Sequence, residues 1–100
     1  MLDTKDISKR IDSNDYLSSE EKTELKELLY SLDEELKKTD AENVEHIAGI
    51  ERIKEVIPHA ASKSEKTEEV LDAVAVFETT HPKITMLIDR ICQLLSNTGI

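Results

Sequence analysis

The sequence predicts an all-α fold, an antiparallel bundle of three or four main helices with a C-terminal helical hairpin. Three observations support it. Leucine and isoleucine recur every three or four residues over long stretches, which is the periodicity of a helix with one apolar face. Only 2 glycines and 2 prolines occur, too few for the many turns of a sandwich or barrel. A length of 100 residues suits one domain.

We expect a single domain over residues 1–100 in which charge and apolar residues are separated along the chain. The formal net charge is -9, yet residues 70–100 hold only 3 acids and 2 bases together with 16 hydrophobic residues. Residues 1–39 are predicted to form acidic N-terminal helices and residues 40–63 a variable middle. The C-terminal hairpin, residues 64–100, is then the natural core of the fold.

The first predicted helix, over residues 2–12, is marginal. It has only Ile7 and Ile11 one helical turn apart, and short isolated helices gain little for the cost of nucleation. Asp3 is its candidate N-cap. The turn-forming composition of residues 13–16 closes it.

The second predicted helix, over residues 19–38, has clearer signals. Ser18 and Glu21 fit a capping box, in which each side chain accepts a hydrogen bond from the other residue's backbone N–H. Its apolar stripe consists of five leucines at helical spacing: Leu25, Leu28, Leu29, Leu32 and Leu36. The stripe predicts one buried face and a charged outer face.

Residues 40–57 are predicted to be helical as well, with Asp40 as the candidate cap. Gly49 lies inside this helix and costs roughly 1 kcal/mol relative to alanine. Pro58 disfavours helical geometry at the residue before it, so the helix is predicted to end there. The polar stretch 61–64 then separates it from the hairpin.

The hairpin is predicted to consist of helices over residues 65–79 and 82–97. Ser64 is the candidate cap of the first helix. Pro82 suits the first position of the second helix, where a backbone N–H has no intrahelical partner. The second helix carries a heptad-like apolar seam. Its members are Ile84, Leu87, Ile88, Ile91, Leu94 and Leu95.

The C-terminal third also contains a distinctive motif. An F-E-x-x-H-P block precedes the last apolar helix, and the chain closes on Gly-Ile. The residues concerned are Phe77, Glu78, His81, Pro82, Gly99 and Ile100. This arrangement resembles a domain-of-unknown-function family of short bacterial helical proteins, and the specific likeness covers roughly residues 70–100. The resemblance implies a small cytoplasmic helical protein and assigns it no activity and no catalytic residues.

Composition excludes several classes of function. An acidic chain lacks the basic patch that nucleic-acid phosphates require. The longest unbroken apolar run, residues 73–77, is far shorter than the roughly 20 residues of a membrane-spanning helix. No apolar stretch follows Met1 as in a secretory signal. We therefore expect a cytoplasmic protein without nucleic-acid or membrane partners.

The histidines and the single cysteine suggest no catalytic, cofactor or metal site. Glu78 and His81 could form an acid/base pair, but no third group converges on them, and a capping role for His81 is favoured. Glu42 and His46 offer two metal ligands where zinc needs three or four, so a surface position is favoured. Cys92 has no identifiable partner base and is expected to be a buried small residue. We predict that the protein is not an enzyme.

The predicted function is a non-enzymatic protein–protein interaction or structural module that acts through helix faces. Six residues are expected in the core or at an interface: Leu25, Leu28, Leu32, Leu87, Ile91 and Leu94. Because small domains are marginally stable, two copies that share the apolar faces of helices 19–38 and 82–97 would gain stability, so self-association is favoured. The alternative is an acidic regulatory binder of a basic partner, for example a nucleic-acid mimic.

Overall fold

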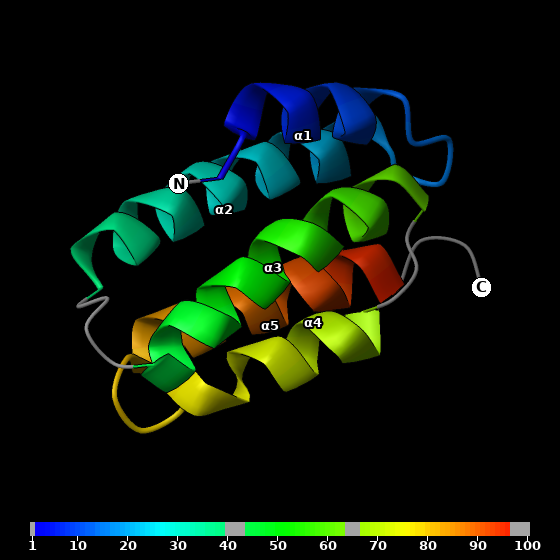
Figure 1. Ribbon diagram of the computed structural model, residues 1–100. Coiled ribbons are helices and arrows are strands. Elements are labelled where there is room, and N and C mark those ends of the chain that lie inside the picture. Colours follow the sequence, from blue (N-terminus) through cyan, green and yellow to red (C-terminus); the bar gives the residue numbers. More distant parts are fainter. Residues whose placement is uncertain (1, 40–43, 64–66, 97–100) are drawn as a thin grey trace.

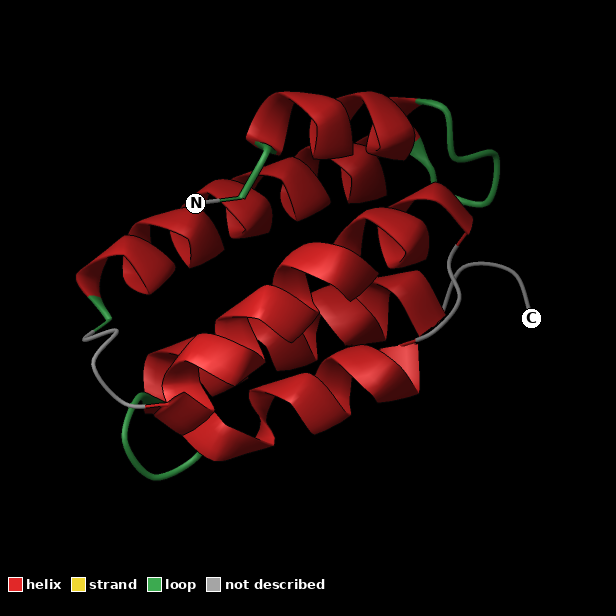
Figure 2. Cartoon of the chain, in the orientation of Figure 1, coloured by secondary structure: helices red, strands yellow, loops and turns green. Residues whose placement is uncertain are grey.

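The computed structural model describes residues 2–39, 44–63 and 67–96, and all regular structure in these segments is helical (Figures 1 and 2). This confirms the all-α prediction. In the described segments there are five α-helices and one short 3-10 helix: α1 (Thr4–Asp12), α2 (Ser19–Lys38), α3 (Val44–Lys63), α4 (Thr67–Val74), η1 (Ala75–Phe77) and α5 (Pro82–Ser96). None of the helices in these segments is long and apolar enough to cross a membrane.

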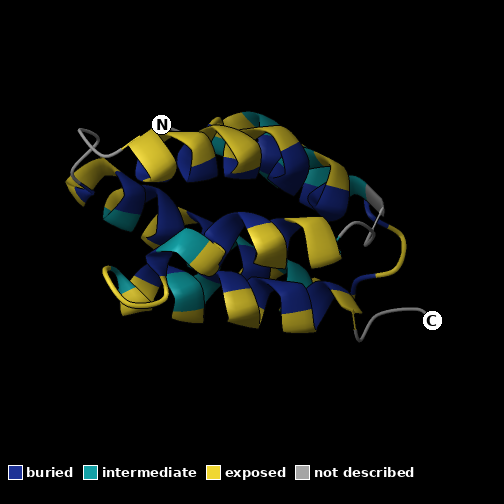
Figure 3. Ribbon diagram, turned by 60° about the horizontal axis from the view of Figure 1, so that its bottom comes forward, coloured by how far each residue is buried: buried dark blue, intermediate teal, exposed yellow. Residues whose placement is uncertain are grey.

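The helices pack as a closed ring around one core (Figure 1). Helix α1 packs on α2 and α3, α2 packs on α5, and α5 packs on α4, which returns to α3. The buried faces point to the inside of this ring and the exposed faces point outward (Figure 3). One apolar cluster includes buried side chains from all five α-helices and η1. Each helix is therefore stabilised by burial of its apolar stripe against two neighbours.

The two N-terminal helices form as predicted. The Asp3 side chain caps α1 by accepting a hydrogen bond from the Asp6 N–H at 3.1 Å. The capping box of α2 is present in both directions, because Ser18 and Glu21 each accept a bond from the other's backbone N–H. These caps satisfy backbone donors that a helix N-terminus leaves unpaired.

A carboxylate of α2 binds the segment that leads into α1 and so connects the first two helices. Asp33 is buried, and its Oδ1 accepts a hydrogen bond from the Leu2 N–H at 2.8 Å. Lys37 lies one turn further on, with Nζ 3.1 Å from Asp33 Oδ2. Burial acts to raise the pKa of Asp33, but the bond from Leu2 and the Lys37 charge outweigh it and lower the pKa. Asp33 is thus held as a charged acceptor for the segment that leads into α1.

The predicted end of the third helix at Pro58 is wrong. Helix α3 continues through Pro58 to Lys63, so the predicted break over 61–64 is also wrong for its first three residues. Proline removes one helical hydrogen bond, but Ile57, Ala60 and Ala61 on either side of it are all buried. Burial of this face against the rest of the bundle outweighs the local preference.

The hairpin is present, with one shorter arm. Its first arm is α4 followed by η1 and ends at Phe77, two residues before the predicted end at Thr79. The tighter 3-10 turn carries the fully buried Phe77. Helix α5 begins at Pro82 as predicted. The predicted caps at Asp40 and Ser64 and the closure at Gly99 and Ile100 lie outside the described residues.

Candidate functional site

The F-E-x-x-H-P block forms the corner between η1 and α5. Phe77 is fully buried, whereas Glu78 is exposed. The N–H of His81 donates to the Phe77 carbonyl at 2.8 Å, which closes the turn. The His81 carbonyl in turn accepts from the Ile84 N–H at 3.0 Å and so joins the first turn of α5 behind Pro82. His81 is therefore the residue before α5, and its carbonyl accepts helical hydrogen bonds, whereas a cap by its side chain stays a prediction.

Three rings and one hydroxyl gather at this corner, and we call the group of His46, Phe77, Thr80 and His81 the histidine corner. The centroid of the His46 ring lies 5.0 Å from that of Phe77 and 5.3 Å from that of His81. The Phe77 and His81 centroids are 5.9 Å apart. A hydrogen bond of 3.1 Å joins His46 Nε2 and Thr80 Oγ1. The histidine corner thereby links the first turn of α3 to the turn of the hairpin between η1 and α5.

The predicted surface position of His46 is wrong, because its side chain is only 7% exposed. The sequence did contain a signal for this burial. His46 lies four residues before Ile50 and seven before Ile53, and both isoleucines are buried on the same face of α3. Continuing the apolar stripe one turn toward the N-terminus would have placed His46 in the core.

The arrangement does not supply the predicted alternative of an acid/base pair. Glu78 makes no hydrogen bond or ion pair with His81 within the described residues, and the ring contacts of His81 are with His46 and Phe77. Within the same residues no three His, Cys, Asp or Glu side chains converge as metal ligands would. The histidine corner instead holds α3 against η1 and the turn that follows it, through ring packing and one hydrogen bond.

Gly49 allows this close packing. A Cβ atom placed on Gly49 would lie 2.9 Å from Val76 Cγ2, 3.1 Å from Phe77 Cε2 and 3.2 Å from the Ala73 carbonyl oxygen. A side chain would therefore push α3 away from α4 and η1. A glycine destabilises a helix, but here the tighter packing of α3 on α4 and η1 offsets that cost.

Cys92 is buried, as predicted. Its Sγ lies 3.8 Å from the Thr67 carbonyl oxygen, to which the thiol can donate a weak hydrogen bond. Burial raises the pKa of the thiol to about 12, and the negative charge of Asp89 adds to the effect. The reactive thiolate is accordingly scarce near neutral pH.

Alkylation of Cys92 should be correspondingly slow. A rise in pKa from 9.0 to about 12 lowers the thiolate fraction about a thousandfold. At mildly alkaline pH we expect iodoacetamide to modify the native protein at least about a hundredfold more slowly than the unfolded chain. Mass spectrometry measures the rate. The matched control is Gln93→Cys in a Cys92→Ala background, which places an exposed thiol one residue away, and equal native rates for the two thiols would contradict the prediction.

The six stripe residues that the sequence offered as core or interface fall into two groups. Four are buried in the core: Leu25, Leu32, Ile91 and Leu94. Leu28 and Leu87 are only partly buried and pack at its edge. Helices α2 and α5 pack against each other within one chain. The faces proposed for sharing between two copies therefore already pack against each other within one chain.

Leu28 and Leu87 lie between two ion pairs that cross from α2 to α5. At one end Arg90 donates to Glu24 Oε1 from Nη2 at 2.7 Å and from Nε at 3.1 Å. At the other end Lys83 Nζ lies 3.1 Å from Glu35 Oε1, and this hydrogen bond lowers the pKa of Glu35 although desolvation opposes it. Because Leu28 follows Glu24 by one turn and Leu87 precedes Arg90 by one turn, both leucines sit between the pairs.

Met86 precedes Leu87 in α5 and is a largely exposed apolar residue, with 70% of its surface exposed. We call Leu28, Met86 and Leu87 the α2–α5 strip. Its apolar centre and charged ends resemble the centre and rim of a protein interface.

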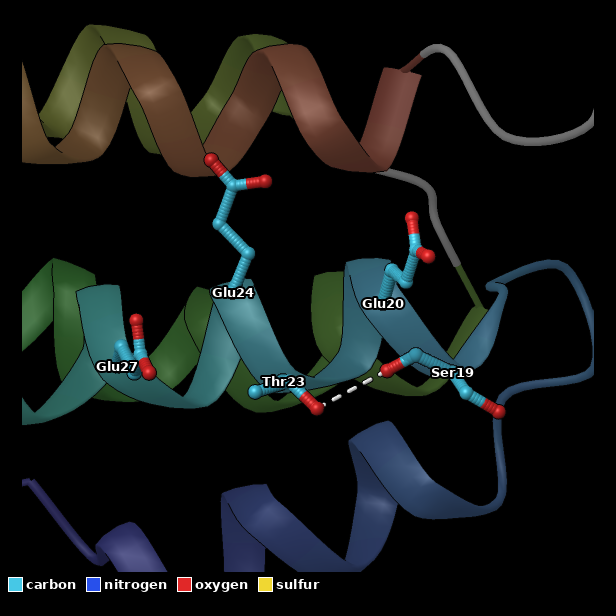
Figure 4. Close-up of a pocket in the computed structure, with 5 residues that line it drawn as sticks. All are labelled: Ser19, Glu20, Thr23, Glu24 and Glu27. Carbon is cyan, nitrogen blue, oxygen red and sulfur yellow. Dashed lines mark hydrogen bonds between the residues drawn. The ribbon is translucent and has the colours of Figure 1, made fainter.

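The outer face of α2 carries a shallow hollow lined by polar and acidic side chains (Figure 4). Its lining consists of Ser19, Glu20, Thr23, Glu24 and Glu27. Thr23 Oγ1 donates to the Ser19 carbonyl at 3.0 Å, and Glu24 is paired with Arg90. The carboxylates make the hollow complementary to positive charge.

Comparison with protein families finds a match that covers the residues of both the histidine corner and the α2–α5 strip. The family described as "Domain of unknown function (DUF4404)" matches residues 22–100, which include most of α2 and all of α3 to α5. Helix α1 precedes the matched residues. Among curated proteins and among solved structures, none matches the chain. The chain thus belongs to the DUF4404 family, whose function is unknown, which confirms the resemblance to a domain-of-unknown-function family.

Proposed function

We propose that the protein is a non-enzymatic, cytoplasmic interaction module whose α2–α5 strip docks an apolar surface of a protein partner. The observation that carries this proposal is the half-buried pair Leu28 and Leu87 between two cross-helix ion pairs, with the exposed Met86 next to Leu87 in the chain. Exposed methionines suit protein docking because their flexible side chains adapt to different apolar surfaces.

The positions of the chemically reactive side chains support a non-enzymatic role. Cys92 is buried with a raised pKa. His46 is packed among rings and bonded to Thr80, and the backbone of His81 begins α5. Each of these groups has a structural role that accounts for its position.

Met86→Glu tests the strip directly. It places a charge at an exposed site, so we expect the melting temperature to stay close to that of the wild type while partner binding is lost. A pull-down from native cell extract, at low and at high salt, measures the binding. Ala48→Glu is the matched control because it adds the same charge at an exposed position of α3, away from the strip. Capture of the same protein by wild type and Ala48→Glu, but not by Met86→Glu, is the expected result.

Two results would contradict this proposal. Met86→Glu could capture the partner as well as the wild type does, which would remove the strip from the interface. Binding could instead weaken steeply with salt, which apolar packing does not do.

Steep salt dependence would favour the second candidate function, a regulatory binder of a basic partner. The observation that supports this alternative is the acidic hollow on α2 with Glu20 and Glu27. Glu20→Gln with Glu27→Gln should then weaken binding, whereas Met86→Glu should not. The two candidates therefore predict opposite outcomes for the same pull-down.

A further inference from the structure

The two sulfur atoms of the described residues lie in opposite environments. Met86 of α5 is 70% exposed, whereas Cys92 on the same helix is 3% exposed. Burial and the charge of Asp89 raise the pKa of the Cys92 thiol to about 12, so the reactive thiolate is scarce near neutral pH. A thioether has no proton to lose, so its exposure decides how readily an oxidant reaches it. The methionine is therefore the more accessible of the two sulfur atoms to an oxidant.

Two cations flank Met86 on the surface of α5. Lys83 lies three residues before it and Arg90 four residues after it, spacings that make side chains neighbours on a helix. Each of the two cations is bound to a carboxylate of α2, Glu35 for the first and Glu24 for the second. Lysine carries three N–H donors and arginine five, more than these bonds use. An oxygen atom added to the methionine sulfur would thus have hydrogen-bond donors on both sides.

We propose that Met86 is an oxidation site at which a peroxide prevents docking on the α2–α5 strip. This inference rests on the proposed function, since it takes the strip as the docking surface. In the reaction an S–O bond forms, the O–O bond of hydrogen peroxide breaks, and the second oxygen leaves as water with both protons. The sulfur is oxidised by two electrons and the peroxide is reduced by two. The product is methionine sulfoxide, which methionine sulfoxide reductases convert back to methionine.

The added oxygen makes an apolar side chain of the strip polar. A sulfoxide that is buried against an apolar partner loses its hydrogen bonds to water, a cost that the thioether does not have. Lys83 and Arg90 instead favour an oxygen that stays at the surface of α5. We expect affinity for the partner to fall at least about tenfold, which is the value of burying one methionine side chain. The melting temperature should stay close to that of the reduced protein, because the side chain is exposed.

Treatment with hydrogen peroxide followed by mass spectrometry of peptides tests the site without any partner. We expect Met86 to be oxidised at a rate within about threefold of the rate in the urea-unfolded chain, because most of its surface is exposed. Cys92 should remain a free thiol under the same conditions. Oxidation of Cys92 before Met86 would overturn the proposal, and so would protection of Met86 by about tenfold or more.

Capture from native cell extract tests the effect on docking. The partner is defined as the protein that the untreated wild type captures and Met86→Glu does not, and the oxidised wild type should capture it at least about tenfold less. Met86→Leu is the matched control. It keeps an apolar side chain, Met1 and Cys92, so peroxide should not change its capture. Ala48→Met in that background returns a methionine at an exposed position of α3 and should not restore sensitivity to peroxide.

The outcomes separate this inference from the function on which it rests. Equal capture by the oxidised and the reduced wild type, with capture lost in Met86→Glu, would overturn the inference and leave the proposed function standing. Capture by Met86→Glu equal to that by the wild type would overturn both. Loss of capture by Met86→Leu after peroxide treatment would overturn the inference alone, because the sensitive group would then lie outside the strip.

Discussion

Phe77→Ala is expected to lower the free energy of unfolding by about 3–5 kcal/mol, as truncation of a fully buried phenylalanine does in other cores. Phe77 is the one phenylalanine of the chain and is 0% exposed. Its removal leaves a cavity beneath the corner and takes away the ring contacts with His46 and His81. Since this ring fills the contact between η1 and the first turns of α3, the cavity cannot close without moving a helix.

Urea unfolding followed by circular dichroism measures this loss. Glu78→Ala is the matched control, because it changes the next residue of the same motif at an exposed position. Its effect should stay within about 0.5 kcal/mol. A loss of less than about 1 kcal/mol for Phe77→Ala would contradict this prediction, because it would mean that the corner repacks around the gap.

The helices whose ends carry local signals could be predicted from the sequence. The start of α2 follows from the capping box of Ser18 and Glu21, and the start of α5 follows from Pro82. Such signals act within one turn, so tertiary contacts do not need to be known. Pro58 shows the opposite case. Its local effect is to end a helix, but the burial of Ala60 and Ala61 beyond it keeps α3 intact.

The candidate site could be predicted only in part, for a similar reason. The F-E-x-x-H-P block stood out in the sequence, but its partner His46 lies 31 residues before Phe77 and meets it only in the folded chain. The stripe of α2 identified Leu28 and Leu32 alike as apolar. Periodicity places a residue on a face but does not say where that face ends, so only the fold separates the edge residue Leu28 from the core residue Leu32.

Gly49→Ala is expected to lower the free energy of unfolding by about 1–2 kcal/mol, although helix propensity alone predicts a gain of about 1 kcal/mol. The new methyl group would lie 2.9 Å from Val76 Cγ2 and 3.2 Å from the Ala73 carbonyl oxygen. The valine side chain can rotate away, but the carbonyl belongs to a packed helix and moves only with it. Overpacking of this kind costs about 1–3 kcal/mol, enough to outweigh the propensity.

Two companion variants separate propensity from packing in the same urea experiment. Ala48→Gly, at the exposed neighbouring position, should cost about 1 kcal/mol from propensity alone. Val76→Ala removes the atom nearest to the new methyl group, so Gly49→Ala should be less harmful in that background by at least about 0.5 kcal/mol. If Gly49→Ala instead stabilised the protein, α3 would be free to shift away from α4 and η1. The glycine would then be unnecessary for the packing of His46 against Phe77, and the histidine corner would tolerate a wider separation of its helices.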